Sequence, residues 1–117
     1  MRRVLVTGGG SGIGRAIAQA FDAGGDQVTI AGRRMDALEE TKGTSGMICR
    51  RLDVTDEGSV KAWVDQPYDV VIANAGGGAA GKVKDLALDD WNHVLTVNLT
   101  GVFLTFREAL QQMGAGG

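Results

Sequence analysis

The chain has 117 residues, of which 44% are hydrophobic, and this length and composition fit one globular domain spanning residues 1–117. A formal net charge of −2 gives no indication of nucleic acid or an anionic membrane as a partner, and no apolar run approaches the length of a membrane span. The single cysteine, Cys49, excludes an internal disulfide and fits a reducing compartment, so we expect a cytoplasmic protein.

The first predicted strand, Val4–Thr7, is short and apolar, as expected of a strand that is covered on both faces. A helix is predicted to follow from Gly12 to Ala23, because apolar residues recur there at helical spacing. We expect these apolar residues to form one buried stripe: Ile13, Ala16, Ile17, Ala20 and Phe21.

The segment between this strand and this helix is typical of a phosphate-binding turn. Its glycines remove the Cβ atoms that would keep an anion from the backbone, and the start of the helix directs free N–H groups to the same place. The spacing is Gly8-x-x-x-Gly12-x-Gly14 rather than GxGxxG, and the absence of Gly-Lys-Ser/Thr argues against a nucleoside-triphosphate loop. The alternative is that the glycines only let the helix and strand pack closely.

Strands and helices alternate along the next part of the chain. The predicted strands are 27–31, 47–52 and 70–72, and the predicted helices are 35–41 and about 56–65. Thr55 is expected to cap the second of these helices, and Pro67 to end it. This helix should bury Val60, Trp63 and Val64.

A glycine-rich loop at 76–81 precedes the longest periodic segment, which predicts a helix of about 25 residues beginning near Asp89. We expect one apolar side of this helix to consist of Trp91, Val94, Leu95, Asn98, Leu99, Val102, Phe103, Phe106, Leu110 and Met113.

This alternation predicts an α/β fold: a Rossmann-like, doubly wound parallel sheet of four strands with helices on both faces. A phosphate turn after the first strand places the ligand at the carboxyl edge of the sheet, where the strand order reverses. We therefore expect the strand order 3-2-1-4.

Four motifs in this chain resemble those of the short-chain dehydrogenase/reductase family, in the order and spacing of its amino-terminal half. They are Thr7–Gly14 (TGxxxGxG), Leu52–Thr55, Asn74–Gly76 and Val97–Gly101. The resemblance implies that the fold holds NAD(H) or NADP(H) and that a hydride moves between the nicotinamide and an alcohol or carbonyl carbon of a small-molecule substrate. It also implies a homodimer or homotetramer of the intact protein.

The resemblance assigns most of the motif residues to the cofactor. Asp53 would accept a hydrogen bond from the adenine amine, with Val54 against the ring; the alternative is a loop carboxylate that caps the next turn. The family usually has an Asn one position before Asn74, where this chain has Ala73. The expected cofactor-binding residues are Gly8, Gly10, Ser11, Gly12, Ile13, Gly14, Arg33, Asp53, Val54, Asn74, Ala75 and Gly76, and no metal is expected.

The end of the second strand indicates NADP rather than NAD. Gly32 stands where members that prefer NAD carry an aspartate, and Arg33 follows at once. An arginine fork makes charge-assisted bonds to a 2′-phosphate, and the Ser11 hydroxyl can add another. The alternative is that Arg33 and Arg34 are solvated residues at the start of a helix.

Asn98 is the one member of the family's catalytic Asn-Ser-Tyr-Lys set that we expect in this chain. An unbonded amide in an apolar stripe would cost about 1–3 kcal/mol, so a partner is expected. The resemblance implies that Asn98 bends the long helix and holds a water of the proton relay; the alternative is a core Asn bonded to nearby backbone. His93 lies off the apolar stripe and is expected at the surface.

The catalytic Ser, Tyr and Lys of the family lie beyond the matched motifs, and the only tyrosine here is Tyr68, which begins no Tyr-x-x-x-Lys. We therefore expect the cofactor-binding half of an enzyme, truncated relative to the full family fold and inactive by itself. The fourth strand should be an unpaired edge, and one side of the long helix should face water. The alternatives are a noncatalytic dinucleotide-binding module and one half of a split protein.

Overall fold

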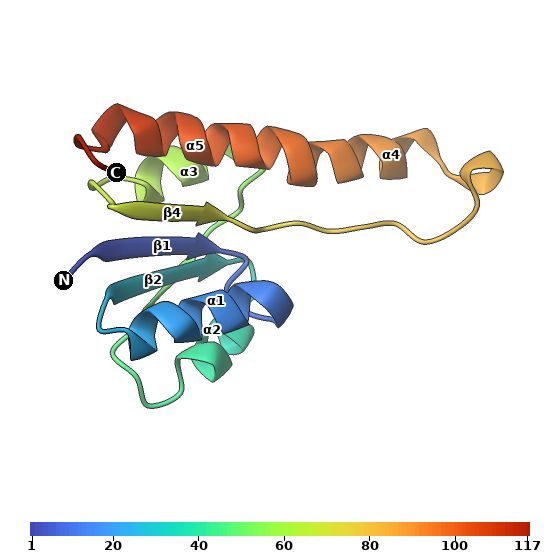
Figure 1. Cartoon of the computed structure of the whole chain (residues 1–117). Helices are drawn as coiled ribbons and strands as arrows, with labels where there is room; N and C mark the ends of the chain where they lie inside the picture. Colours follow the sequence, from blue (N-terminus) through green and yellow to red (C-terminus); the bar gives the residue numbers. More distant parts are fainter.

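The computed structural model describes all 117 residues, Met1–Gly117, and contains one parallel sheet between two layers of helices (Figure 1). The strands are β1 (Arg3–Thr7), β2 (Gln27–Gly32), β3 (Ile48–Arg51) and β4 (Val70–Ala73). They lie in the order β3-β2-β1-β4, and every neighbouring pair is parallel. The predicted fold class and strand order are confirmed.

Two helices, α1 (Gly12–Ala23) and α2 (Met35–Lys42), cover one face of the sheet (Figure 1). The other face carries α3 (Glu57–Trp63) and a long helical segment from Leu88 to Gln112. This segment consists of α4 (Leu88–Leu95), one π-helical stretch η2 (Thr96–Thr100) and α5 (Gly101–Gln112), and the short 3₁₀ turn η1 (Val83–Asp85) precedes it. None of these helices has both the length and the apolar character that a membrane crossing requires.

Each face of the sheet has its own core. Alternate residues of β1 divide between the two faces: Val4 and Val6 point toward α1 and α2, and Leu5 points toward α3 and α5. The α1/α2 core is completed by Ala18, Val28, Ile30, Leu38 and Met47, and the α3/α5 core by Ala31, Leu52, Val54, Val60, Val64, Tyr68, Leu104 and Ala109. Because both faces are covered over most of their length, the middle residues of β1, Val4–Val6, are apolar on both sides.

The start and end of α3 differ from the prediction. The cap is Asp56, whose Oδ1 accepts from the N–H groups of Gly58 and Ser59, and not Thr55. The Thr55 hydroxyl instead donates to Asp53 Oδ1 at 2.6 Å, so it is unavailable to the helix. The helix also ends at Trp63, before Pro67. Val60 and Val64 are buried, as expected, whereas Trp63 is only half-buried.

The buried stripe predicted for α1 is only partly right. Ile17 and Phe21 pack against the core, but Ile13, Ala16 and Ala20 are exposed. The fully buried positions of α1 are Gly14 and Ala18. Small residues at these two positions let the helix approach the sheet closely, which turns the larger apolar residues to its flanks.

The apolar side predicted for the long helix is largely the side that faces water. Leu99 and Leu110 are 66% and 67% exposed, whereas Gly101, Leu104 and Ala109 are buried against the sheet. A Cβ on Gly101 would lie 2.7 Å from Val54 Cγ2, so small residues bring α5 close to the core. The expectation that one side of this helix faces water is confirmed, and β4 is an edge strand that pairs only with β1.

Candidate functional site

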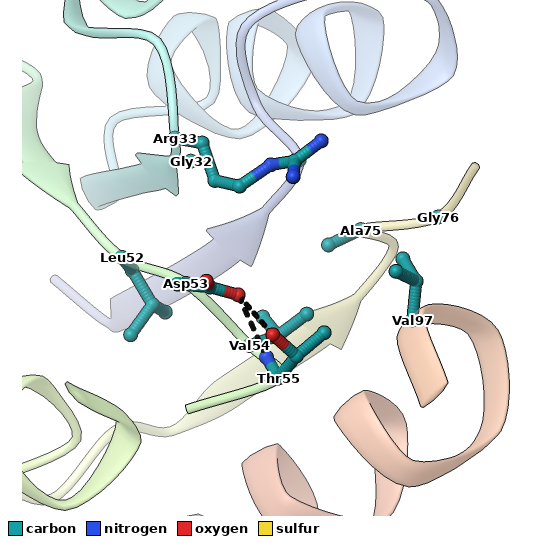
Figure 2. Close-up of a pocket in the computed structure, with 10 residues that line it drawn as sticks. Gly32, Arg33, Leu52, Asp53, Val54, Thr55, Ala75, Gly76 and Val97 are labelled. Carbon is teal, nitrogen blue, oxygen red and sulfur yellow. Dashed lines mark hydrogen bonds between the residues drawn. The ribbon is translucent and has the colours of Figure 1, made fainter. Parts of the chain in front are cut away.

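The carboxyl ends of the strands open onto two adjoining cavities of about 120 and 180 Å³, which share Gly8, Gly32 and Arg33. In Figure 2, Arg33, Asp53 and Ala75 approach the first cavity from the ends of three different strands. The other residues that line the two cavities are Gly10, Ser11, Arg34, Ala37, Leu38, Leu52, Val54, Thr55, Gly76 and Val97.

The glycine-rich turn between β1 and α1 is packed so tightly that two positions require glycine. Gly8 has a φ of +68°, and a Cβ there would lie 2.8 Å from the Cα of Ala75. A Cβ on Gly14 would overlap the carbonyl oxygen of Gly8. The strand, the turn and the helix are therefore held at backbone contact. Ser11 is the N-terminal cap residue of α1, and its exposed hydroxyl makes no capping bond, so it remains available to a ligand.

Two residues that the sequence analysis missed hold this turn from its outer side. Arg15 Nη2 donates to the carbonyl oxygen of Gly10 at 2.7 Å, and Arg15 Nε donates to Thr41 Oγ1 at 2.9 Å. The buried Thr41 hydroxyl in turn donates to the carbonyl oxygen of Gly9 at 2.8 Å. The carbonyl oxygens of Gly9 and Gly10 therefore both have partners. These bonds fix the orientation of the two peptide groups, whose N–H bonds point in the opposite direction. No spacing in the sequence links residue 15 to residue 41, so no sequence pattern indicated this pair.

The end of β1 is tied to the end of β4 by Thr7, a role that the motif alone did not reveal. The buried Thr7 hydroxyl accepts from the backbone N–H groups of Asn74 and Ala75 at 3.0 and 3.1 Å. The Asn74 side chain donates to the carbonyl oxygen of Gly8 at 3.2 Å. These bonds join the two strands where Ala73 replaces the expected amide.

Asp53 lines the first cavity, and one of its carboxylate oxygens is occupied locally. Oδ1 accepts from the Thr55 hydroxyl at 2.6 Å and from the Thr55 N–H at 2.9 Å. These bonds, with the hydroxyl contributing most, lower the pKa of the Asp53 carboxyl below its usual value. The local bonds match the alternative of a loop carboxylate, while Oδ2 makes no protein hydrogen bond and remains available to a ligand.

The two arginines after β2 differ in their partners. Arg34 Nη2 pairs with Asp36 Oδ2 at 3.0 Å, so its charge is already balanced. Arg33 forms neither an ion pair nor a hydrogen bond with another side chain, and it lines both cavities. Gly32, directly before it, presents no carboxylate. Arg33 is therefore the one cation lining the two cavities that has no ion-pair partner, although the Asp53 carboxylate lines the first cavity with it.

Asn98 lies in the π-helical stretch η2 and is exposed, which corrects the expectation that it lies in a buried stripe. Its amide is bonded to backbone: Nδ2 donates to Gly77 O at 2.7 Å and to Val94 O at 2.9 Å, and Oδ1 accepts from Gly77 N at 3.3 Å. A Cβ on Gly76 would lie 2.6 Å from Asn98 Oδ1. Asn98 thus attaches the loop after β4 to the long helix. His93 is exposed, as expected.

The structure brings most of the expected cofactor-binding residues to one place. Eight of them line the two cavities: Gly8, Gly10, Ser11, Arg33, Asp53, Val54, Ala75 and Gly76. Gly12, Ile13, Gly14 and Asn74 do not line a cavity but belong to the turn, the first turn of α1 and the end of β4. The cofactor-binding roles of all twelve residues stay predictions.

Comparisons with known proteins all indicate the same family. The sequence model of the short chain dehydrogenase family matches residues 2–117. The NADP-dependent (R)-specific alcohol dehydrogenase of Lentilactobacillus kefiri is 35% identical over 119 residues, which cover 93% of this chain and 47% of that protein.

Solved structures of similar proteins indicate the same family. A short-chain type dehydrogenase/reductase from Mycobacterium marinum superposes with a TM-score of 0.89 at 31% identity, over 94% of this chain and 49% of that one. An alcohol dehydrogenase from Thermococcus sibiricus, in complex with 5-hydroxy-NADP, gives a TM-score of 0.88 at 29% identity, over 96% and 53%. The chain therefore spans about half the length of these three relatives.

Proposed function

Because this chain belongs to the short-chain dehydrogenase family, we propose that it forms the coenzyme-binding half of an NADP(H)-dependent oxidoreductase. The intact protein would transfer a hydride between the nicotinamide and the carbon of a small-molecule alcohol or carbonyl compound. The observation that carries the choice of coenzyme is Arg33, which has no ion-pair partner and lies beside Gly32 at a cleft that continues along the glycine-rich turn.

The residues present fit the adenosine end of such a coenzyme. Gly8 lines both cavities without a side chain, and the start of α1 offers free N–H groups and the Ser11 hydroxyl to phosphate oxygens. The free oxygen of Asp53 can accept from the adenine amine, with Val54 against the ring. The Arg33 guanidinium can bind a 2′-phosphate through charge-assisted bonds. When bound, the nicotinamide supplies or accepts the hydride; this chain binds and orients the adenosine end.

Substitution of Arg33 tests the choice of coenzyme. We expect Arg33→Ala to weaken NADPH binding about tenfold or more, since a hydrogen bond to a charged group contributes roughly 1.5–3 kcal/mol. NADH affinity should change little, because NADH has no 2′-phosphate. Arg34→Ala is the comparison, with a smaller loss expected because Arg34 is already paired with Asp36. Isothermal titration calorimetry with both coenzymes measures these differences.

A second substitution, Gly32→Asp, tests the coenzyme preference by adding a carboxylate. A Cβ at residue 32 would lie 3.5 Å from Leu38 Cδ2, an ordinary contact, so the side chain can be accommodated. The new carboxylate should repel the 2′-phosphate and accept from a ribose hydroxyl, which shifts the preference toward NADH. Equal NADPH and NADH affinities in the parent protein, unchanged by Arg33→Ala, would contradict the NADP assignment.

The catalytic step should need residues beyond these 117. Tyr68 is 3% exposed and lies before β4, at the opposite end of the strands from the cleft, and it begins no Tyr-x-x-x-Lys sequence. We expect the chain by itself to bind NADPH without oxidising it in the presence of aldehydes or ketones. Carbonyl-dependent loss of absorbance at the NADPH band, above that of a heat-denatured sample, would contradict this expectation.

A further inference from the structure

A second polar cavity, of about 160 Å³, lies at the amino ends of the strands, away from the dinucleotide cleft. Strand register explains its origin. Arg3 pairs with Gln27 and Thr29 pairs with Ile48, and residues two apart on a strand share a face, so these side chains and Arg50 lie on the α3/α5 face of the sheet.

Helix α3 is too short to cover this part of the sheet. Its 7 residues span about 10 Å at roughly 1.5 Å per residue, less than the length of the neighbouring strands. Apart from Ile48, the strand residues that line the cavity are polar. Gln66 and Tyr68, from the segment between α3 and β4, line the remaining side, and Gln66 Nε2 donates to the Tyr68 hydroxyl oxygen at 3.2 Å.

The cavity contains two arginines and no acidic residue. Neither Arg3 nor Arg50 forms an ion pair with a carboxylate. The guanidinium of Arg50 lies over the ring of Trp63, 4.8 Å from its centroid. Stacking of this kind holds the guanidinium plane in place and leaves its in-plane N–H groups free.

One of these N–H groups has no partner although it is buried. Arg50 Nε is the only buried side-chain nitrogen or oxygen in the structure without a hydrogen bond. Such an orphan donor on a charged group is costly. A ligand reaches the buried Nε only after a small shift of the side chain, whereas the two Nη groups of Arg50 are accessible and have no hydrogen-bond partner in the protein. The volume far exceeds the roughly 10–15 Å³ that one water needs, so the cavity has space for a larger acceptor.

We propose that this cavity is a binding site for a phosphate-sized tetrahedral oxyanion, held by Arg50 and Arg3. Donors come from different sides: Arg3 from β1, Arg50 from β3, Thr29 and Gln27 between them, and Tyr68 above. This arrangement suits an anion with oxygens in several directions better than a planar carboxylate. The site is independent of the dinucleotide cleft and of the function proposed for it.

Trp63 provides a local reporter. The chain has two tryptophans, so Trp91→Phe leaves Trp63 as the only one. Inorganic phosphate and sulfate, added at constant ionic strength against chloride, should change the Trp63 emission saturably, and acetate should not. Isothermal titration calorimetry measures the same affinities without the fluorophore.

Four substitutions in this background test the assignment. Arg50→Gln and Arg3→Gln should each weaken phosphate binding about tenfold or more. Arg51→Gln, which removes the same charge from an exposed residue that does not line the cavity, should leave the affinity unchanged. Arg33→Ala should also leave the phosphate affinity unchanged, because Arg33 lies at the carboxyl ends of the strands and the cavity lies at their amino ends. Circular dichroism checks folding, and if Arg50→Gln does not fold, Arg3→Gln decides.

Three results would overturn the proposal. The first is phosphate affinity that survives both Arg50→Gln and Arg3→Gln, or Arg3→Gln alone if Arg50→Gln is unfolded. The second is acetate binding as tight as phosphate binding. The third is a phosphate response that Arg33→Ala abolishes, which would place the anion at the glycine-rich turn.

Discussion

At the scale of single residues, Thr7 decides how the cleft is built. Its hydroxyl is buried and accepts from two backbone N–H groups of the neighbouring strand end, at Asn74 and Ala75. Replacement by an apolar side chain of the same shape would leave both donors without a partner. Thr7 therefore does more than precede the glycines in the sequence. It sets the position of the loop after β4, which the ligand is expected to contact.

Thr7→Val tests this role. We expect the free energy of unfolding to fall by about 1–3 kcal/mol, the usual cost of unsatisfied buried donors, while Thr7→Ser stays close to the parent. Urea denaturation followed by circular dichroism measures both variants. A valine variant as stable as the parent, or a serine variant as unstable as the valine one, would show that the hydroxyl contributes nothing.

At the scale of elements, helix α2 supports the turn that precedes α1. Thr41, near the end of α2, and Arg15, in α1, bond to the carbonyls of Gly9 and Gly10. Two helices on the same face of the sheet are thereby linked to the segment expected to bind phosphate. Rigid backbone at that position lowers the entropy cost of ordering a ligand.

Arg15→Met removes this support and keeps the aliphatic stem of the side chain. Amide hydrogen exchange at residues 9–12 should become faster, and NADPH affinity should fall several-fold, roughly the loss of one hydrogen bond of about 1 kcal/mol. Arg51→Met, at an exposed position that lines neither cavity of the cleft, is the matched control. Unchanged exchange at residues 9–12 would mean that the turn is rigid without Arg15.

At the scale of the whole molecule, the long helix and β4 leave an apolar surface in water. Leu99, Phe103 and Leu110 are 66%, 56% and 67% exposed on α5 and the stretch before it, and β4 has an open edge. Contiguous apolar surface of this kind favours association. Figure 1 shows α5 running along the sheet and α4 projecting beyond the ends of the strands.

We expect the 117-residue chain to self-associate in solution. Leu99→Gln combined with Leu110→Gln should shift sedimentation toward the monomer, because both side chains are exposed and contribute little to the core. Gln111→Ala, at an exposed polar position on the same helix, is the control and should not shift it. A parent chain that sediments as a monomer at high concentration would contradict this prediction.

Much of the molecule could be predicted from local patterns. The bounds of α1 agree residue for residue, because a glycine pair ends it and a glycine turn begins it. The cap of α3 was wrong because Thr55 and Asp56 are both good capping residues, and only the bond from Thr55 to Asp53 decides between them. The apolar side of the long helix was wrong because periodicity shows that apolar residues share a face, not what covers that face.

The sequence by itself determined the alternation of strands and helices, their parallel order and the edge at which the glycine turn lies, since each depends on neighbouring residues and on the handedness of connections. Only the tertiary structure decided that Thr7 joins β1 to β4, that Arg15 and Thr41 support the turn, and that Arg33 has no ion-pair partner. These properties depend on which residues far apart in the sequence come into contact in the fold, and no local pattern shows such contacts.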